Sequence, residues 1–250
     1  MEILSVASFG YVCLGLFVGF LSGFLGIGGG AAAVPILVFL GFDVKYAIGV
    51  SVLQMMFSSV YGSLLNLKNK TLDLKPALVL GSGGFCGASA SGFIVASVPS
   101  KFLLLTLICI QIFNVIKLFF KNPEPKGAHN PSLVPLFFVG LFVGAVAISV
   151  GIGGSVIIMP VLINFLNYDI KKAISTGLFF VIFSSISGFI SLTLQGLVQY
   201  EVGVLVGIGS LISVRFGVAL AQKIDRAIQK RCLLALICTT LIIMINKLFA

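Results

Sequence analysis

The chain has 250 residues, of which 59% are hydrophobic and only 9% are charged, and its mean hydropathy is +1.20. These values lie outside the range of soluble domains and predict an integral membrane protein. The net charge of +9 does not indicate nucleic-acid binding, because the lysines and arginines lie at the edges of apolar segments, where positive charge sets membrane topology.

The first apolar stretch, at about residues 11–42, contains a glycine cluster that a straight membrane helix would not need. As one helix it would be ~48 Å long, well beyond the ~30 Å hydrocarbon core of a bilayer. Cut at the glycines, it becomes pieces of about 16 and 11 residues, and the second piece is too short to cross. We therefore predict a re-entrant hairpin that enters and leaves by the same membrane face, with Gly26 and Pro35 as hinge positions.

The polar segment KNPEPKGAHNPS separates two sets of apolar segments. The first half continues with about 44–67, 76–96 and 101–120, and the second half contains about 135–166, 170–194, 202–222 and 229–249. No stretch is long or polar enough to form a soluble domain. We predict one integral domain with a first membrane repeat at 1–120, a basic cytoplasmic linker at 121–132 and a second membrane repeat at 133–250.

The two halves are copies of one unit. The stretch GLFVGFLSGFLGIGGGAAAVPIL, from Gly15, realigns on GLFVGAVAISVGIGGSVIIMPVL, from Gly140, at a constant offset of 125 residues. After a one-residue insertion the match continues with DVKYAI against DIKKAI and with FSSVYG against FSSISG. A repeat over nearly the whole chain indicates a duplicated architecture. The second half therefore has its own hairpin, with hinges at Gly151 and Pro160.

Positive charge tests the topology, because loops rich in Lys and Arg face the cytoplasm. If each glycine segment crossed once, six of these residues would lie on one side and eight on the other, which fixes no orientation. With re-entrant segments, eleven lie on one side and only Lys45, Lys101 and Lys247 on the other. This split places both termini outside the cytoplasm. Two full spans per glycine segment satisfy the count equally, so only the short second piece favours the hairpin.

Each half then has three full crossings besides its hairpin, and this odd number makes the halves inverted relative to each other. The predicted fold class is an all-α integral membrane protein of two inverted repeats, each a re-entrant helix hairpin plus three transmembrane helices. Inverted repeats with interrupted helices are a recurrent plan of secondary transporters, whose substrate binds near the midplane where the interruptions meet.

The glycine turns are the first candidate binding site. Non-helical backbone at membrane depth must be buried in protein or line a wet cavity. A helix N-terminus exposes N–H groups and carries partial positive charge, so it binds anions without Lys or Arg. We expect the two turns to meet and form an anion site. The residues of this site are Gly28, Gly29, Gly30, Gly153, Gly154 and Ser155.

Glycines four residues apart also let helices pack closely. We favour that interpretation for Gly15, Gly19, Gly140 and Gly144. It does not account for the G-x-G-G clusters, because close packing does not require consecutive glycines. Ser155 stands where the first copy has Gly30, so the two turns need not contact an anion equally. A serine hydroxyl can itself donate to an anion.

Polar side chains inside apolar segments are the second group of candidates, because burying them in a bilayer costs free energy and often marks a pathway. Ser51 and Gln54 share one face of the helix after the first hairpin, and Thr176 lies on the equivalent second helix. We predict that all three line the pathway. The alternatives are a bond between helices for Gln54 and bonds to their own backbone for the hydroxyls. Asp43 and Asp169 each precede a helix and are expected to cap it.

Groups that catalysis or redox chemistry would need are missing from the apolar segments. No Asp, Glu or His lies deep in any of them, so the relay typical of proton-driven carriers is absent. The five cysteines are odd in number and lack C-x-x-C spacing. We expect no cofactor, no metal and no catalytic residue, and a membrane enzyme is the least favoured class.

The paired glycine motifs, each followed by an Asp, a short basic stretch and a polar FSS helix, resemble the sulfite exporter TauE/SafE family, also called the toluene-sulfonate uptake permeases. The resemblance covers essentially the whole chain. It implies a bacterial inner-membrane transporter of small sulfur-containing or organic anions, such as sulfite or sulfonates. Members differ in substrate, so the resemblance fixes the class of substrate only.

We therefore predict a secondary transporter that carries a small anion by alternating access around the paired glycine turns. The alternative is an anion channel, in which two half-helices also meet at the midplane. The expected partners are the small anion and the lipid bilayer. Nucleic acid is not an expected partner, and the sequence leaves a homodimer open.

Overall fold

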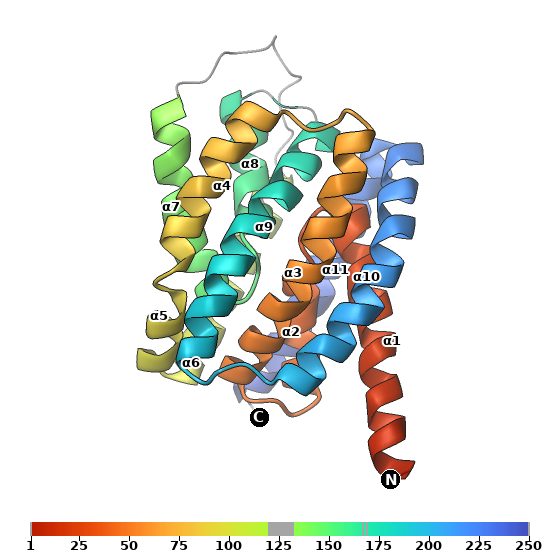
Figure 1. Cartoon of the computed structure of the whole chain (residues 1–250), viewed down its shortest axis with the longest axis vertical. Helices are drawn as coiled ribbons and strands as arrows, with labels where there is room; N and C mark the ends of the chain where they lie inside the picture. Colours follow the sequence, from red (N-terminus) through yellow and green to blue (C-terminus); the bar gives the residue numbers. More distant parts are fainter. Residues whose placement is uncertain (1, 120–132, 167, 169, 250) are drawn as a thin grey trace.

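The computed structural model describes residues 2–119, 133–166, 168 and 170–249, and all regular structure in these ranges is helical. Figure 1 shows the helices as one elongated bundle. Their bounds are α1 Glu2–Leu25, α2 Gly30–Phe39, α3 Val44–Lys68, α4 Leu74–Ala88, α5 Ser91–Ser97, α6 Ser100–Phe119, α7 Leu133–Ser149, α8 Ser155–Leu166, α9 Ile170–Leu194, α10 Tyr200–Lys223 and α11 Arg226–Phe249. The predicted linker 121–132 and the predicted cap Asp169 lie outside the described residues.

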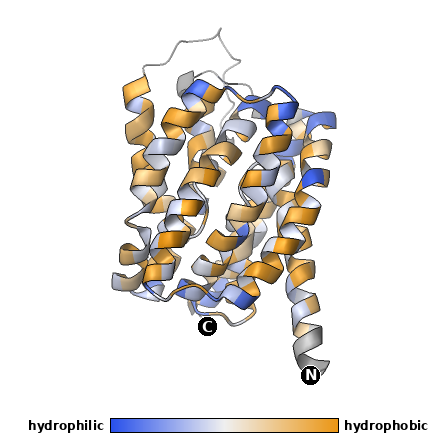
Figure 2. Ribbon diagram, viewed as in Figure 1, coloured by the Kyte–Doolittle hydropathy of each residue, from blue (hydrophilic) through white to orange (hydrophobic). Residues whose placement is uncertain are grey.

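Six helical stretches among the described residues are long and apolar enough to cross a membrane. They are Ala7–Leu25, Val44–Lys68, Leu74–Ser97, Lys171–Leu194, Tyr200–Lys223 and Ala227–Leu248. Large apolar side chains also cover the outer surface, where Phe9, Phe39 and Phe93 are each about 70% exposed. Figure 2 shows hydrophobic residues along most of the height of the bundle. An exposed apolar surface of this extent fits a bilayer rather than water as the surrounding solvent.

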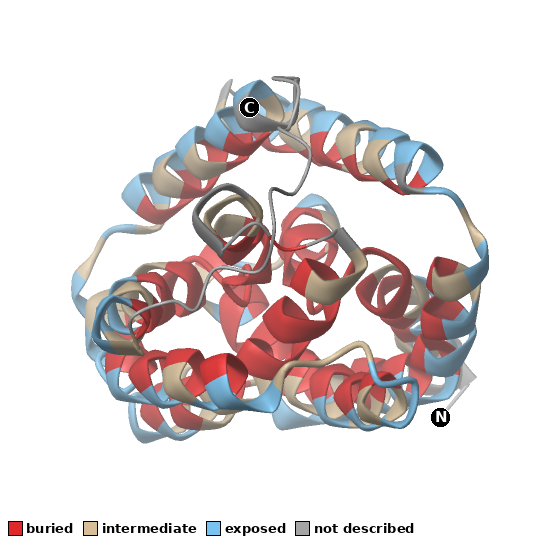
Figure 3. Ribbon diagram, turned by 90° about the horizontal axis from the view of Figure 1, so that it is seen from above, coloured by how far each residue is buried: buried red, intermediate tan, exposed pale blue. Residues whose placement is uncertain are grey.

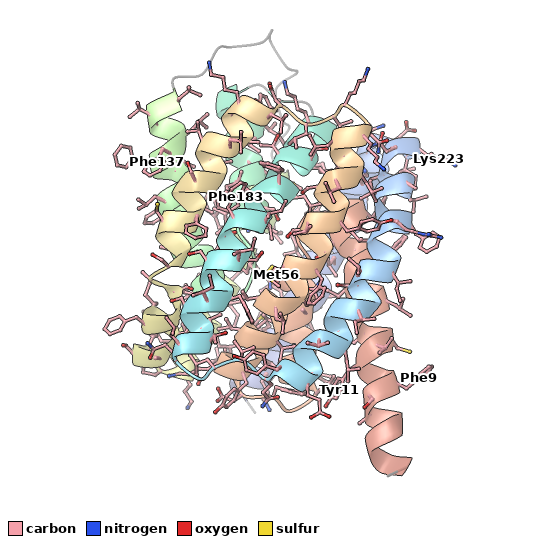
Figure 4. All side chains as sticks on the ribbon, viewed as in Figure 1. Phe9, Tyr11, Met56, Phe137, Phe183 and Lys223 are labelled. Atoms are coloured by element: carbon pink, nitrogen blue, oxygen red, sulfur yellow. The ribbon has the colours of Figure 1, made fainter. Side chains whose placement is uncertain are left out.

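The two ends of the bundle differ in charge. We call the end where α3 and α10 finish the basic end, because seven described lysines lie there: Lys68, Lys70, Lys75, Lys171, Lys172, Lys223 and Lys230. Both chain termini lie at the opposite end, which we call the terminal end (Figure 1). Lys223 marks the basic end in Figure 4, and Tyr11 lies toward the terminal end.

Both predicted helix interruptions are present. α1 runs from the terminal end into the bundle, and after the break at residues 26–29 α2 returns toward that same end (Figure 1). α7 starts at the basic end, and after the break at residues 150–154 α8 returns toward it. The two hairpins therefore open toward opposite ends of the molecule. α3 begins beside the first hairpin, and the Asp43 carboxylate caps it by accepting from the Lys45 backbone N–H at 2.9 Å, as predicted.

The predicted length of the first hairpin arm is wrong. α1 has 24 residues rather than about 16, because the residues before Tyr11 contain no proline and only one glycine, Gly10, to end the helix early. This arm is ~36 Å long, enough to cross a bilayer, whereas the 10 residues of α2 span only ~15 Å. The short second arm alone therefore limits the depth of the hairpin.

The predicted segment at 76–96 is broken into α4 and α5. The break is held by Ser191 of α9, whose hydroxyl donates to the Ser89 carbonyl at 2.6 Å and accepts from the Gly92 N–H at 2.9 Å. These bonds replace helix hydrogen bonds at the break. A contact from a distant helix thus sets a boundary that local sequence does not mark.

The two halves are interlocked through their first helices. α1 packs on α10 of the second half, and α7 packs on α4 of the first half. A Cβ on Gly15 would overlap the Val206 carbonyl, and a Cβ on Gly140 would overlap the equivalent Leu80 carbonyl. The close-packing interpretation of these glycines is confirmed, and Gly19 and Gly144 make the same kind of contact.

The interior of the bundle lies around α3 and α9. The membrane-length window of α3 is 67% buried, against 33% for that of α11. Seen from above in Figure 3, buried residues fill the middle and exposed residues form the rim. The helices that follow the two hairpins thus place their polar side chains where the two glycine turns meet.

Candidate functional site

Both turns have the same unusual backbone geometry. φ is 67°, 73° and 90° at Gly26, Gly28 and Gly29, and 74°, 82° and 83° at the equivalent residues Gly151, Gly153 and Gly154. L side chains rarely adopt these values, so the turns require glycine. The other two residues predicted as hinges, Pro35 and Pro160, lie inside α2 and α8, five residues after each helix start.

The two turns are in direct contact. A Cβ on Gly30 would overlap the carbonyl oxygen of Gly151, so the start of α2 lies against the second turn. The Ser51 hydroxyl of α3 donates to this same carbonyl at 3.0 Å. The first residues of α2 and the second turn, 121 positions apart in the sequence, are thus joined at the centre of the bundle.

Two apolar side chains lie between the turns. The Met55 sulfur is 2.8 Å from the position a Cβ on Gly30 would take, and it also borders Gly28 and Gly153. Val181 borders Gly28 and Gly153 from α9. Met55 and Val181 are equivalent under the repeat, being 126 residues apart, so each helix contributes one side chain to the same contact. Met56, the neighbour of Met55, marks this level of α3 in Figure 4.

The turns leave backbone donors free. Within the part of the chain that the structure describes, the N–H groups of residues 28–31 and 153–156 donate to no protein atom. The first N–H groups of a helix have no partner within the helix, and α2 and α8 begin at Gly30 and Ser155. Because these residues are buried, the free donors lie where water is scarce and where an unpaired N–H is costly.

A short chain of hydrogen bonds supports the first turn. The Gln54 amide donates to the Ser58 hydroxyl at 3.1 Å, and the Ser58 hydroxyl lies 3.3 Å from the Gly28 carbonyl. Ser22 donates to Ser58 from α1 at 3.2 Å. In the second half, the Ser184 hydroxyl lies 3.5 Å from the Gly153 carbonyl. The first serine of each FSS motif therefore reaches a turn carbonyl, and only the first copy adds an amide.

The remaining candidate side chains differ in whether they have a hydrogen-bond partner. Ser51 uses its hydroxyl to hold the second turn, rather than bonding its own helix. The Oγ of Ser155, the Oγ1 of Thr176 and the Oε1 of Gln54 have no hydrogen-bond partner among the described residues. All three side chains are fully buried. Ser155 and Thr176 therefore keep a hydroxyl proton available for a ligand.

The sequence pattern does not distinguish the apolar residues of the site from other core residues. Met55 and Val181 are apolar residues in apolar helices, and so are Ile48 and Ile174, which pack against Gly151 and Gly26 respectively. Only the repeat alignment could have found them, because it makes Met55 equivalent to Val181 and Ile48 equivalent to Ile174. A search for polar residues passes over all four.

The basic end carries the clearest electrostatic cluster. Asp73 pairs with Lys172 at 2.8 Å, and the Tyr168 hydroxyl donates to the same carboxylate at 3.4 Å. Burial, followed by the Asp73 charge and this hydrogen bond, raises the pKa of Tyr168 from 10.0 to about 12. The Lys172 ammonium lies 4.4 Å from the centre of the Tyr168 ring. These contacts tie the loop before α4 to the start of α9.

The six membrane-length helical stretches, the two helix interruptions and the apolar surface define a multi-pass membrane protein. A model of the sulfite exporter TauE/SafE family matches residues 11–244. The chain therefore belongs to the sulfite exporter TauE/SafE family.

Curated relatives carry transporter names. The chain is 28% identical over 232 residues to a "probable membrane transporter protein" of Methanocaldococcus jannaschii, with 86% of each chain covered. It is 27% identical to YunE of Bacillus subtilis, with 86% of this chain and 88% of the relative covered, and 25% identical to YdhB of the same organism, with 85% and 89% covered. Both Bacillus proteins have the same descriptive name. No solved structure matches the chain.

Proposed function

We propose that the protein is a secondary transporter of small anions, such as sulfite or organic sulfonates, which works by alternating access around the paired glycine turns. The observation that carries the proposal is the contact between the start of α2 and the second turn, beside two buried sets of N–H groups, at residues 28–31 and 153–156, that have no protein partner among the described residues. Sulfite and sulfonate oxygens are acceptors that such donors bind. The name of the family points to the same class of substrate.

The surroundings of the turns favour an anion over a cation. Aligned peptide dipoles give each helix N-terminus about half a positive charge, and two of them face one region here. Among the described residues no Asp or Glu is buried, so no fixed negative charge at the turns opposes an anion. No Lys or Arg of these residues is buried either, so the anion is not trapped by a full countercharge.

The arrangement of the halves supports alternating access. We interpret the two halves as inverted repeats, because their hairpins open toward opposite ends of the bundle. Since α1 packs on α10 and α7 on α4, the long arm of each hairpin is held by a helix of the other half. The positive-inside rule then places the basic end in the cytoplasm and both termini outside the inner membrane.

Flux into proteoliposomes tests the proposal. We expect influx of sulfite or of an organic sulfonate that saturates with concentration and that is accelerated by the same anion inside the vesicles. Chloride should compete weakly. An anion channel, built on the same meeting of half-helices, would instead give flux that does not saturate and shows no acceleration by internal anion. Indifference to every anion tested would overturn both assignments.

A further inference from the structure

A narrow polar pocket lies below the basic end, between the first turn and the surface. Its polar lining comes from Asn66, Thr71, Lys171, Ser175, Gln222 and Gln229, and Ile174 lies among them. The pocket has room for about one water molecule. It therefore admits one polar atom of a ligand in this structure.

The pocket contains buried polar groups without partners. The Asn66 side chain is 3% exposed and the Gln229 side chain is 2% exposed. Asn66 Nδ2 and Gln229 Oε1 have no hydrogen-bond partner among the described residues. An unpaired buried amide costs free energy, so such groups indicate a ligand or an ordered water. Lys171 adds a cation at the same place, and its Nζ donates to the Gln222 carbonyl at 2.9 Å.

The pocket connects the surface with the first turn. Thr71 and Lys171 also line an open hollow of about 500 Å³ at the basic end. In that hollow Lys172 is paired with Asp73, which leaves the Lys171 charge uncompensated by any carboxylate in the hollow. At the inner side, Ile174 packs against Gly26. Ile174 is thus the side chain that separates the pocket from the turn.

The terminal end lacks this polar lining. The repeat places Leu192 where the first half has Asn66, and Leu103 where the second half has Gln229. Only the lysine has a true counterpart, because Lys45 donates to the Ala96 carbonyl at 2.8 Å as Lys171 does to Gln222. The two lysines share one structural role, and only Lys171 borders an amide-lined pocket.

We propose that the pocket is an anion-selective vestibule on the cytoplasmic side, in which Lys171 and Asn66 Nδ2 bind one oxygen of an anionic substrate before it passes Ile174. The ligand class is a small oxyanion or sulfonate whose remaining atoms stay in the open hollow. The assignment of the glycine turn as the next site rests on the proposed function. The selectivity of the vestibule for anions does not.

Thiol labelling tests the vestibule without any transport. Thr71→Cys is made in a chain whose five native cysteines, all exposed, are replaced by serine. In proteoliposomes the introduced thiol reacts with methanethiosulfonate reagents of similar size, one carrying a sulfonate and one a trimethylammonium group. We expect the sulfonate reagent to react faster. Equal rates for the two charges, or a faster cationic reagent, would overturn the proposal.

Lys171→Gln and Lys45→Gln are the matched variants. Removing a unit charge about 4 Å away changes a charged reagent's local concentration by roughly 5-fold, so Lys171→Gln should lower the anion-to-cation rate ratio by at least that factor. Lys45→Gln should leave the ratio unchanged, although it breaks an equivalent bond. Lys171→Arg keeps the charge and should keep the ratio, which separates lost charge from lost folding. A ratio that falls equally in both glutamine variants would contradict the proposal.

Protection by a ligand identifies the amide contact. Methanesulfonate should slow labelling of the Thr71→Cys thiol, and Asn66→Leu, which copies Leu192 of the terminal end, should reduce this protection at least 3-fold. Protection that is unchanged in Asn66→Leu would remove Asn66 from the site. Charge-selective labelling without anion flux would support the vestibule and refute the proposed transport function. Anion flux without charge-selective labelling would support transport and refute the vestibule.

Discussion

Gly30 and Gly151 are in van der Waals contact across the two halves, with no room for a side chain on Gly30 beside the Gly151 carbonyl. The equivalent position in the second half is Ser155, which borders Gly177 of α9. Within the paired clusters GIGGG and GIGGS, this is the only position at which the two copies differ. The start of α2 is pressed against the opposite turn and has no room for the serine that its counterpart carries.

Gly30→Ser should destabilise the protein by about 1–3 kcal/mol, because the added atoms displace the second turn. Ser155→Gly is the matched change, and it should alter stability by less than about 1 kcal/mol, because the removed hydroxyl has no protein partner. Thermal unfolding in detergent compares the two variants. Equal shifts of Tm would show that the contact at Gly30 is not tighter than that at Ser155.

Gly29→Ala should be more damaging than Gly41→Ala. Both residues have positive φ, 90° and 96°, so each alanine costs about 1–2 kcal/mol in backbone conformation. A Cβ on Gly29 would also lie 2.7 Å from Val18 and 2.9 Å from the Gln54 amide, whereas Gly41 faces open space. We expect Gly29→Ala to abolish anion flux and Gly41→Ala to retain it. A loss of flux in both variants would instead point to backbone strain alone.

Gln54→Leu should separate stability from function. The change removes a buried carbonyl oxygen without a partner and also the amide bond to Ser58, whose hydroxyl still accepts from Ser22, so the free energy of unfolding should change by less than about 1 kcal/mol. Flux should fall at least tenfold if Gln54 lines the pathway as proposed. The control is Gln111→Leu, because the Gln111 carbonyl accepts from Thr240 of α11 at 2.8 Å. That variant should lose Tm and keep flux, and the opposite pattern would place Gln54 in a purely structural role.

Tyr168 should make the protein sensitive to alkaline pH. Its pKa is raised to about 12, so folding favours the protonated phenol. This contribution is complete below pH 10, the ordinary pKa of the unfolded chain, and it is lost as pH rises toward 12. The loss is about 2–3 kcal/mol for two pKa units. Unfolding of the wild type and of Tyr168→Phe at pH 9 and pH 11.5 measures it, and identical pH dependence in the two proteins would contradict the assignment.

The glycine-marked part of the fold follows from the sequence. Gly28 and Gly153 interrupt helices because consecutive glycines disfavour the helix and allow positive φ, and the repeat identifies both interruptions at once. The cap at Asp43 is equally local, because its carboxylate accepts from the backbone N–H of Lys45, only two residues further along the chain. Features that depend on a few neighbouring residues can therefore be predicted from the sequence.

Features set by distant partners could not be predicted. The break before α5 falls at Ser89 and Ala90 in a stretch with several helical glycines, and its position depends on the Ser191 hydroxyl from α9. Met55 lies between the turns, yet it has the same apolar surroundings in the sequence as any core residue. The length of α1 could not be predicted from the apolar pattern, because its first residues lie before the apolar stretch that begins at about residue 11.

The packing of α1 on α10 sets an order for biosynthesis. When α1 enters the bilayer, its partner has not yet been translated, so the glycine face that meets Val206 has only lipid against it. α7 is in the opposite position, because α4 is already inserted when α7 emerges. The second hairpin can therefore dock as it is made, whereas the first waits for almost the whole chain. Nascent chains that stop before α10 leave an undocked first helix.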